Sequence, residues 1–194
     1  MPGWKDRPRS FHRMAEFLAG SGWPPDRVVS VSFEDPFESS IAHAAELAAV
    51  VDDVLRHCPG TLHIVAHSMG GLATRWFLHE YPAAAAVRRV VFLATPHNGT
   101  WSAWMAWGEG AREMRPGSPF LRRLAERPLP GHVQTFTVRT PIDTHVVPGR
   151  HATLDGATNV LVRMPTHRGL LRNARVFEAI RGALLQPDQS WPPG

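Results

Sequence analysis

The chain has 194 residues, of which 43% are hydrophobic and 20% are charged, the balance of an ordinary globular domain with one sizeable core. Lysine and arginine outnumber aspartate and glutamate by 21 to 17, and this net charge of +4 is not gathered into a dense basic run, so we expect no nucleic-acid partner. No apolar run approaches the roughly 18 residues of a membrane span. Cys58 has no second cysteine with which to form an intrachain disulfide.

The N-terminal segment is charged rather than apolar. It carries Lys5, Asp6, Arg7 and Arg9 and has no continuous apolar stretch, so it does not have the pattern of a signal peptide. We therefore expect a cytoplasmic location by default, unless the N-terminus is truncated, and no integral association with a membrane. The sequence leaves the oligomeric state open.

Hydrophobic periodicity predicts helices that alternate with strands. The clearest helix covers residues 40–57, where apolar side chains recur at i, i+3, i+4, i+7 and i+8 from Leu47. The fully apolar run at residues 90–93 is typical of a buried parallel strand. The predicted helices cover residues 11–19 (with Ser10 as the cap), 40–57, 70–80, 119–127 and 170–185, and the predicted strands cover residues 28–33, 62–66, 87–93, 133–138 and 160–164.

This alternation predicts an α/β fold with a mostly parallel sheet and helices on both of its faces. We expect one domain over residues 1–185, followed by a loose, proline-rich tail at residues 186–194. Ligand sites in such sheets lie at the carboxyl ends of the strands. These ends are therefore where chemically active side chains should be sought.

A serine follows the predicted strand 62–66 almost at once, in the order Ala66-His67-Ser68-Met69-Gly70. Small residues two positions before and after the serine permit the strained turn of a nucleophile elbow, and Gly70 also permits close packing of the next helix. In such a turn the Ser68 hydroxyl is presented at the sheet edge, and the Met69 N–H can point toward an oxyanion. The alternative is an ordinary strand-to-helix turn that contains a serine.

A serine nucleophile needs a base, and the base needs an acid to orient it. On this architecture the expected chain order is serine, acid, histidine. Asp143 follows the predicted strand 133–138, and His167 follows the predicted strand 160–164 just before the last helix. Because the carboxyl ends of parallel strands meet at one edge, we expect both side chains to lie near Ser68.

Other acids and histidines offer alternatives. Asp155 is a rival acid, but its Asp-Gly pair favours a turn. His67 is expected to pack locally, and His97 could line the site but is more often structural. His145 and His151 lie near Asp143 and could suggest a metal, but no pair of histidines shows a metal-ligand spacing together with a carboxylate, so we expect no metal and no cofactor.

Together these residues resemble the α/β-hydrolase superfamily, and most closely the small, lidless bacterial lipases that share A-H-S-M-G-G. The likeness extends over nearly the whole chain, from Pro2 to about Leu185. It is carried by Ser21-Gly22-Trp23, Ala66 to Gly71, Leu154-Asp155-Gly156-Ala157 before Asn159-Val160, and His167-Arg168-Gly169-Leu170-Leu171, while Thr95 to Gly99 is similar to the T-P-H-x-G segment of other bacterial lipases.

The resemblance implies a serine esterase or lipase that acts on a small-molecule ester or lipid through an acyl-enzyme, without a cofactor. It implies a triad of Ser68, Asp143 and His167. The oxyanion hole of the family uses the N–H after the serine, here Met69, and the N–H after an N-terminal His-Gly pair. Here that pair is Pro2-Gly3, so the resemblance assigns the second donor to Trp4.

The chain departs from the family at its start. Proline stands in place of the usual histidine, and the family's strand just before this pair has no room ahead of Met1. We therefore expect one edge of the strand 62–66 to lack a hydrogen-bonding neighbour. We infer that the start is assigned late or that the chain is a fragment, with Trp4 poorly held, and expect an upstream extension to raise stability and activity.

Residues 101–115 hold three tryptophans and two methionines, which suits an apolar acyl chain but also suits a core or cap role. Two alternatives to an esterase stay open: a thioesterase or amidase on the same triad, and a non-catalytic or truncated hydrolase-like module.

Overall fold

The computed structural model describes residues 1–4, 8–163 and 165–186. Four strands form one sheet in the order β1-β2-β3-β4, and every neighbouring pair is parallel. The strands are β1 (Leu62–His67), β2 (Val87–Leu93), β3 (Gln134–Arg139) and β4 (Thr158–Leu161). The predicted α/β fold with a parallel sheet is confirmed.

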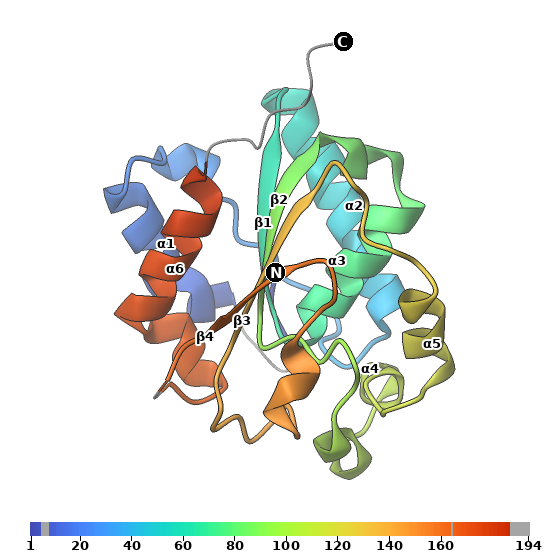
Figure 1. Ribbon diagram of the computed structural model, residues 1–194. Coiled ribbons are helices and arrows are strands. Elements are labelled where there is room, and N and C mark those ends of the chain that lie inside the picture. The colour runs from blue at the N-terminus through green and yellow to red at the C-terminus, as the bar shows by residue number, and fades with distance from the viewer. Residues whose placement is uncertain (5–7, 164, 187–194) are drawn as a thin grey trace.

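Helices cover both faces of this sheet (Figure 1). Helices α1 (His12–Gly20) and α6 (Ala174–Leu185) lie on one face, and α2 (Ser40–His57) and α3 (Met69–Glu80) lie on the other. The remaining helices are α4 (Glu109–Glu113), α5 (Pro119–Ala125) and the 3-10 turns η1 (Pro8–Phe11), η2 (Pro25–Arg27), η3 (Pro82–Ala86), η4 (Trp101–Met105), η5 (Gly149–Ala152) and η6 (Arg168–Arg172).

Strand β2 joins the two halves of the core. Val90 and Phe92 point into the apolar cluster under α2 and α3, whereas Val91 and Leu93 point into the cluster under α1 and α6. All four side chains are fully buried. A central parallel strand is covered on both faces, which explains why its sequence is continuously apolar rather than alternating.

Strand β1 has a strand neighbour on one side only in the described part of the chain. On its other side Met1 makes two backbone contacts: its ammonium donates to the Val65 carbonyl (2.9 Å), and the His67 N–H donates to the Met1 carbonyl (3.0 Å). Strand β1 is thus an edge strand of the described sheet, as expected, but its outer edge does not lack a hydrogen-bonding neighbour, because Met1 supplies two bonds there. The two bonds place the N-terminal residues beside the turn that carries Ser68.

The predicted strand at residues 28–33 is wrong. Val28 has extended backbone angles, but the segment pairs with no strand among the described residues. Val29 and Val31 line a cavity of about 130 Å³ together with Ile64 and Val65 of β1. The backbone of the segment therefore forms no strand ladder with β1 among the described residues.

Other differences concern element ends. Ser10 lies inside η1 instead of capping a helix, and α1 begins at His12 without a side-chain cap. The last strand is β4, earlier than the predicted 160–164, and α6 begins only after η6, capped by Asn173. Most of the predicted loose tail, residues 187–194, lies outside the described residues. None of the described helices combines the length and the apolarity needed to cross a membrane.

Candidate active site

Ser68 occupies a strained turn between β1 and α3. Its backbone angles are φ 53° and ψ −128°, a conformation that costs an L-residue about 1–3 kcal/mol. The Ser68 N–H donates to the Leu93 carbonyl at 2.8 Å, which ties the turn to the end of β2. The serine is therefore held where the carboxyl ends of the two strands meet.

Two glycines allow neighbouring segments to approach this turn. A Cβ on Gly70 would lie 2.2 Å from the Pro2 carbonyl oxygen, and a Cβ on Gly71 would lie 1.9 Å from Thr95 Oγ1. Any side chain at either position would displace its neighbour. The close approach at Gly70 is thus to the N-terminal residues, whereas the sequence had suggested packing on the strand.

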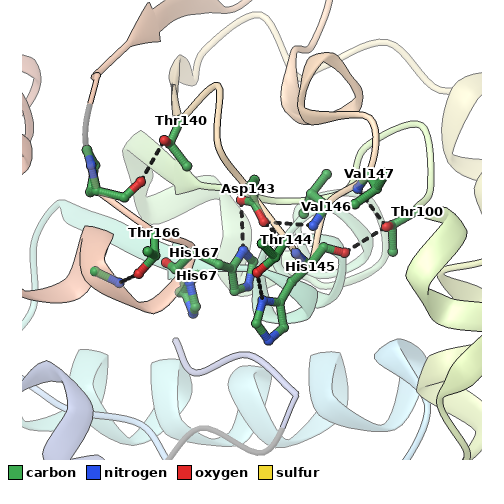
Figure 2. A network of polar contacts seen from close by, with 12 residues as sticks. His67, Thr100, Thr140, Asp143, Thr144, His145, Val146, Val147, Thr166 and His167 are labelled. Atoms are coloured by element: carbon green, nitrogen blue, oxygen red, sulfur yellow. Dashed lines mark hydrogen bonds and ion pairs between the residues drawn. The ribbon is translucent and has the colours of Figure 1, made fainter.

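His167 and Asp143 form a buried pair (Figure 2). His167 Nδ1 lies 2.9 Å from Asp143 Oδ2, and the side chains are only 5% and 1% exposed. The other carboxylate oxygen, Oδ1, accepts the N–H groups of His145 and Val146, each at 2.8 Å. Because a carboxylate can only accept, Nδ1 carries the proton, and Nε2 of a neutral ring is left with its lone pair.

The surroundings keep His167 neutral near pH 7. Burial lowers the pKa of His167 to about 4, and the hydrogen bond to Asp143 only partly opposes this. Burial would raise the pKa of Asp143, but the hydrogen bond and charge of His167 and the backbone N–H groups outweigh it and lower that pKa. The pair therefore combines a neutral ring with an ionised carboxylate, the state that a general base requires.

Hydroxyl groups fix the loops that carry the pair. Thr140, directly after β3, donates to the Pro165 carbonyl at 2.6 Å and so joins the acid loop to the histidine loop. Thr100 donates to the His145 carbonyl (2.7 Å) and accepts the Val147 N–H (2.9 Å) (Figure 2). Sequence reasoning missed both threonines; the only local signal was the position of Thr140 immediately after a strand.

Two further histidines flank the ring of His167. The ring of His145 stacks on it at 4.6 Å with an interplanar angle of 15°, and the ring of His67 lies 4.6 Å away on a tilt. His67 Nε2 also lies 3.2 Å from the His167 carbonyl oxygen. The local packing expected for His67 is observed, and the stacking of His145 is a feature that the sequence did not reveal.

A cavity of about 170 Å³ opens in front of these groups. Ser68 and His167 both line it, and so does Trp4. Met69 begins α3, so its N–H lies in the first helical turn, where backbone donors have no intrahelical acceptor. All five residues singled out in the sequence thus gather at one end of the sheet. The rival acid Asp155 lies elsewhere, on a different cavity together with His97.

Asp143, His145 and His167 also form a group that could in principle hold a metal ion. One potential ligand atom from each lies within 4.8 Å of the others. Sequence spacing did not reveal this cluster. However, both Asp143 oxygens and His167 Nδ1 are already engaged with one another or with backbone N–H groups, so a cation would have to break those bonds.

The mouth of the cavity is apolar. Met105, which lines the cavity, is 83% exposed, and Trp101, Trp104 and Trp107 on the same segment are 58–60% exposed. Trp107 also packs edge-on against Trp4 at 5.5 Å. The segment, which includes η4 and α4, therefore places Met105 at the cavity and exposes three tryptophans elsewhere on its surface.

Comparison with known proteins gives a consistent result. The mature lipase BlEst2 of Bacillus licheniformis superposes with a TM-score of 0.78 at 17% identity, over 94% of this chain and 89% of that one. Aspergillus fumigatus lipase B superposes with a TM-score of 0.81 at 19% identity, over 95% of this chain and 51% of that one. Phospholipase PlaB of Legionella pneumophila, in complex with thio-NAD, superposes with a TM-score of 0.77 at 13% identity, over 96% of this chain and 58% of that one.

These likenesses show the fold that the sequence had suggested, and the chain spans only about half of the Aspergillus lipase. Residues 4–150, well over half of the chain, match the family model described as Lecithin:cholesterol acyltransferase. The protein therefore belongs to the lecithin:cholesterol acyltransferase family of lipase-like α/β-hydrolases.

Proposed function

We propose that this protein hydrolyses carboxylic esters of lipids through a serine acyl-enzyme. The observation that carries the proposal is the convergence of a strained serine and a buried, neutral Asp143–His167 pair on one small cavity. Such a pairing activates a hydroxyl that is otherwise a weak nucleophile. The lipase-like fold supports the same chemistry.

In the first half-reaction Ser68 Oγ attacks the ester carbonyl carbon while His167 Nε2 takes the hydroxyl proton. The Asp143 carboxylate stabilises the resulting imidazolium through Nδ1. The oxyanion forms hydrogen bonds to the N–H groups of Met69 and Trp4. When the intermediate collapses, the ester C–O bond breaks and His167 returns its proton to the departing alkoxide.

In the second half-reaction a water molecule attacks the acyl-enzyme. His167 Nε2 takes one proton from this water, and the same N–H groups hold the second oxyanion. Collapse releases the carboxylic acid, and the proton on His167 returns to Ser68 Oγ. The exposed Met105 at the cavity, on a segment that also exposes three tryptophans, favours substrates with an acyl chain over small polar esters.

A fluorophosphonate probe tests the nucleophile. The parent protein should be labelled, and Ser68→Ala should abolish labelling while the protein still unfolds cooperatively. His167→Gln and Asp143→Asn should slow labelling by about two to four orders of magnitude, as in other triads of this type. Absence of labelling in the folded parent would favour a non-catalytic module instead.

A substrate panel tests the reaction class. We expect p-nitrophenyl esters of increasing acyl length to be cleaved faster than the matching thioesters and anilides. Faster thioester or amide cleavage would favour the thioesterase or amidase alternative. The family to which the chain belongs is named after an acyltransferase, an enzyme that passes the acyl group to an alcohol instead of water. The panel should therefore include an alcohol acceptor such as cholesterol, with the ester product measured beside the free acid.

A further inference from the structure

A second cavity, of about 550 Å³, lies on the other side of the loop that follows β2. It is bounded by α3, by the segment 127–133 and by the segment 153–156. His97 and Asn98 of the loop line this cavity, whereas Pro96 and Thr100 line the cavity at Ser68. The proposed triad contributes no side chain here, and the ester reaction described above makes no use of the space.

Arg75 of α3 lines the cavity and is only 4% exposed. Its Nη2 donates to the Leu124 carbonyl at 2.9 Å, but its Nε has no hydrogen-bond partner and no carboxylate pairs with it among the described residues. Burial lowers the pKa of Arg75 to about 10, so the guanidinium remains charged at neutral pH. A buried cation without a counter-ion is unfavourable, so its charge is available to an anion.

His97 adds a second unsatisfied group. It is 4% exposed, its ring packs edge-on against Phe92 at 4.8 Å, and neither ring nitrogen has a partner within the described chain. Burial, and secondarily the charge of Arg75, hold the pKa of His97 well below its ordinary value. The ring is therefore neutral and retains one N–H to donate. Buried polar groups normally find partners, so two such groups on one cavity point to a ligand.

Apart from Arg75, one basic and one acidic residue line the cavity. Arg127 lines it and forms an ion pair with Glu80, and it also lies over the Trp76 ring. Asp155 is the acidic residue that lines the cavity, and its side chain is exposed. The volume exceeds what a bare ion fills, so the ligand has room for more than its charged group.

From this arrangement we propose that the cavity binds an oxyanion, a phosphate or carboxylate group, with Arg75 and His97 as its principal ligands. The guanidinium supplies charge and a directed N–H, and the imidazole supplies a neutral N–H. Bound there, the anion would satisfy the donors that the protein itself leaves without partners. It would also contact the loop whose other side forms a wall of the Ser68 cavity.

Isothermal titration calorimetry at constant ionic strength tests the proposal, with inorganic phosphate, acetate and glycerol phosphate as separate probes. We expect saturable binding, weakened about tenfold or more in Arg75→Met and in His97→Phe, since each removes a strong hydrogen bond. The matched control Arg181→Gln, on α6, should bind as the parent does. Asp155→Asn should bind more tightly, because it removes the opposing charge. Preference for glycerol phosphate over inorganic phosphate would identify an organic phosphate as the source.

A spectroscopic readout makes the test specific. In NMR spectra, phosphate should raise the pKa of His97, identified by the signal lost in His97→Phe, because a nearby anion favours the protonated ring. Absence of saturable binding, or equal binding by the parent, Arg75→Met and His97→Phe, would overturn the proposal. If Arg75→Met does not fold, the binding measured for His97→Phe and the titration of His97 test the proposal instead. None of these measurements depends on catalysis, so they stand or fall separately from the ester reaction.

Discussion

Ser68 is the residue at which stability and chemistry conflict most directly. Its backbone has a positive φ. Because Gly70 and Gly71 have no side chains, Pro2 and Thr95 can lie in direct contact with this turn. Strain of this kind persists only where the surrounding contacts fix the backbone. Here those contacts include the bond from the Ser68 N–H to the Leu93 carbonyl.

Relief of this strain is measurable. Ser68→Gly should raise the free energy of unfolding by about 1 kcal/mol relative to Ser68→Ala, because glycine adopts φ 53° without a Cβ clash. Urea unfolding of both variants provides the measurement. Both lack the nucleophile, so they differ only in backbone freedom and one methyl group. Equal stabilities would show that the turn is not strained.

Met105 lines the cavity and is also highly exposed to solvent. Met105→Ser should lower kcat/KM for long-chain esters about fivefold to tenfold, since it removes apolar contact area from the acyl chain. It should leave acetyl and butyryl esters unaffected. Met105→Leu is the matched control and should preserve the preference. A uniform loss across chain lengths would argue against an acyl contact at this residue.

At the scale of elements, the apolar segment at the mouth is anchored by a buried acid. Glu113 of α4 is 7% exposed, and its carboxylate accepts the Ser40 N–H at the start of α2 at 2.5 Å. Ser39 caps the same helix by accepting the Ala42 N–H. The carboxylate thus satisfies a helix donor that has no intrahelical acceptor, and it joins α4 to α2.

Loss of this anchor should destabilise the fold. Glu113→Ala should lower the free energy of unfolding by about 1–3 kcal/mol, because it leaves a buried N–H without a partner. Glu109→Ala, on the same helix, removes only an exposed pair with Arg112 and should change stability by less than about 0.5 kcal/mol. Denaturant unfolding of the two variants decides. Equal free energies of unfolding for the two variants would show that the contact between α4 and α2 does not stabilise the fold.

Sequence reasoning succeeded where local pattern and chain order sufficed. Strand β2 has the predicted bounds, and Asp143 and His167, each expected to follow a strand, form a hydrogen-bonded pair at 2.9 Å. It failed where partners lie far apart in sequence. The predicted strand at residues 28–33 would have needed a neighbouring strand, and the described sheet provides none. The stacking of His145 on His167 depends on how two loops fold together.

At the scale of the whole molecule, two cavities share the loop after β2. Each has a buried histidine at its wall, His167 at one and His97 at the other. Burial is the largest cause of the lowered pKa of both rings. The loop that carries His97 therefore lies between the cavity at Ser68 and His167 and the cavity proposed to bind an anion.

These buried histidines make activity and stability respond differently to acid. In the folded state the pKa of His167 is about 4, below the ordinary value of 6.5, so this proposed general base stays neutral well below pH 6.5. The decrease of kcat/KM in acid should therefore begin only well below pH 6.5.

The free energy of unfolding should respond at higher pH, because the two histidines take up protons in the unfolded chain before they do so in the folded protein. The stabilising contribution is complete above about pH 6.5 and is lost progressively toward pH 4.

Thermal unfolding and kinetics over this pH range give the test. Tm should decline between pH 7 and pH 4.5 while kcat/KM, measured well below Tm, is retained. His97→Phe should flatten part of the Tm decline because it removes one of the two protonation sites, whereas replacement of the exposed His12 by phenylalanine should not. A kinetic acid limb near pH 6.5 would contradict the argument, because it would mean that the ring of His167 is protonated as easily in the folded protein as in water.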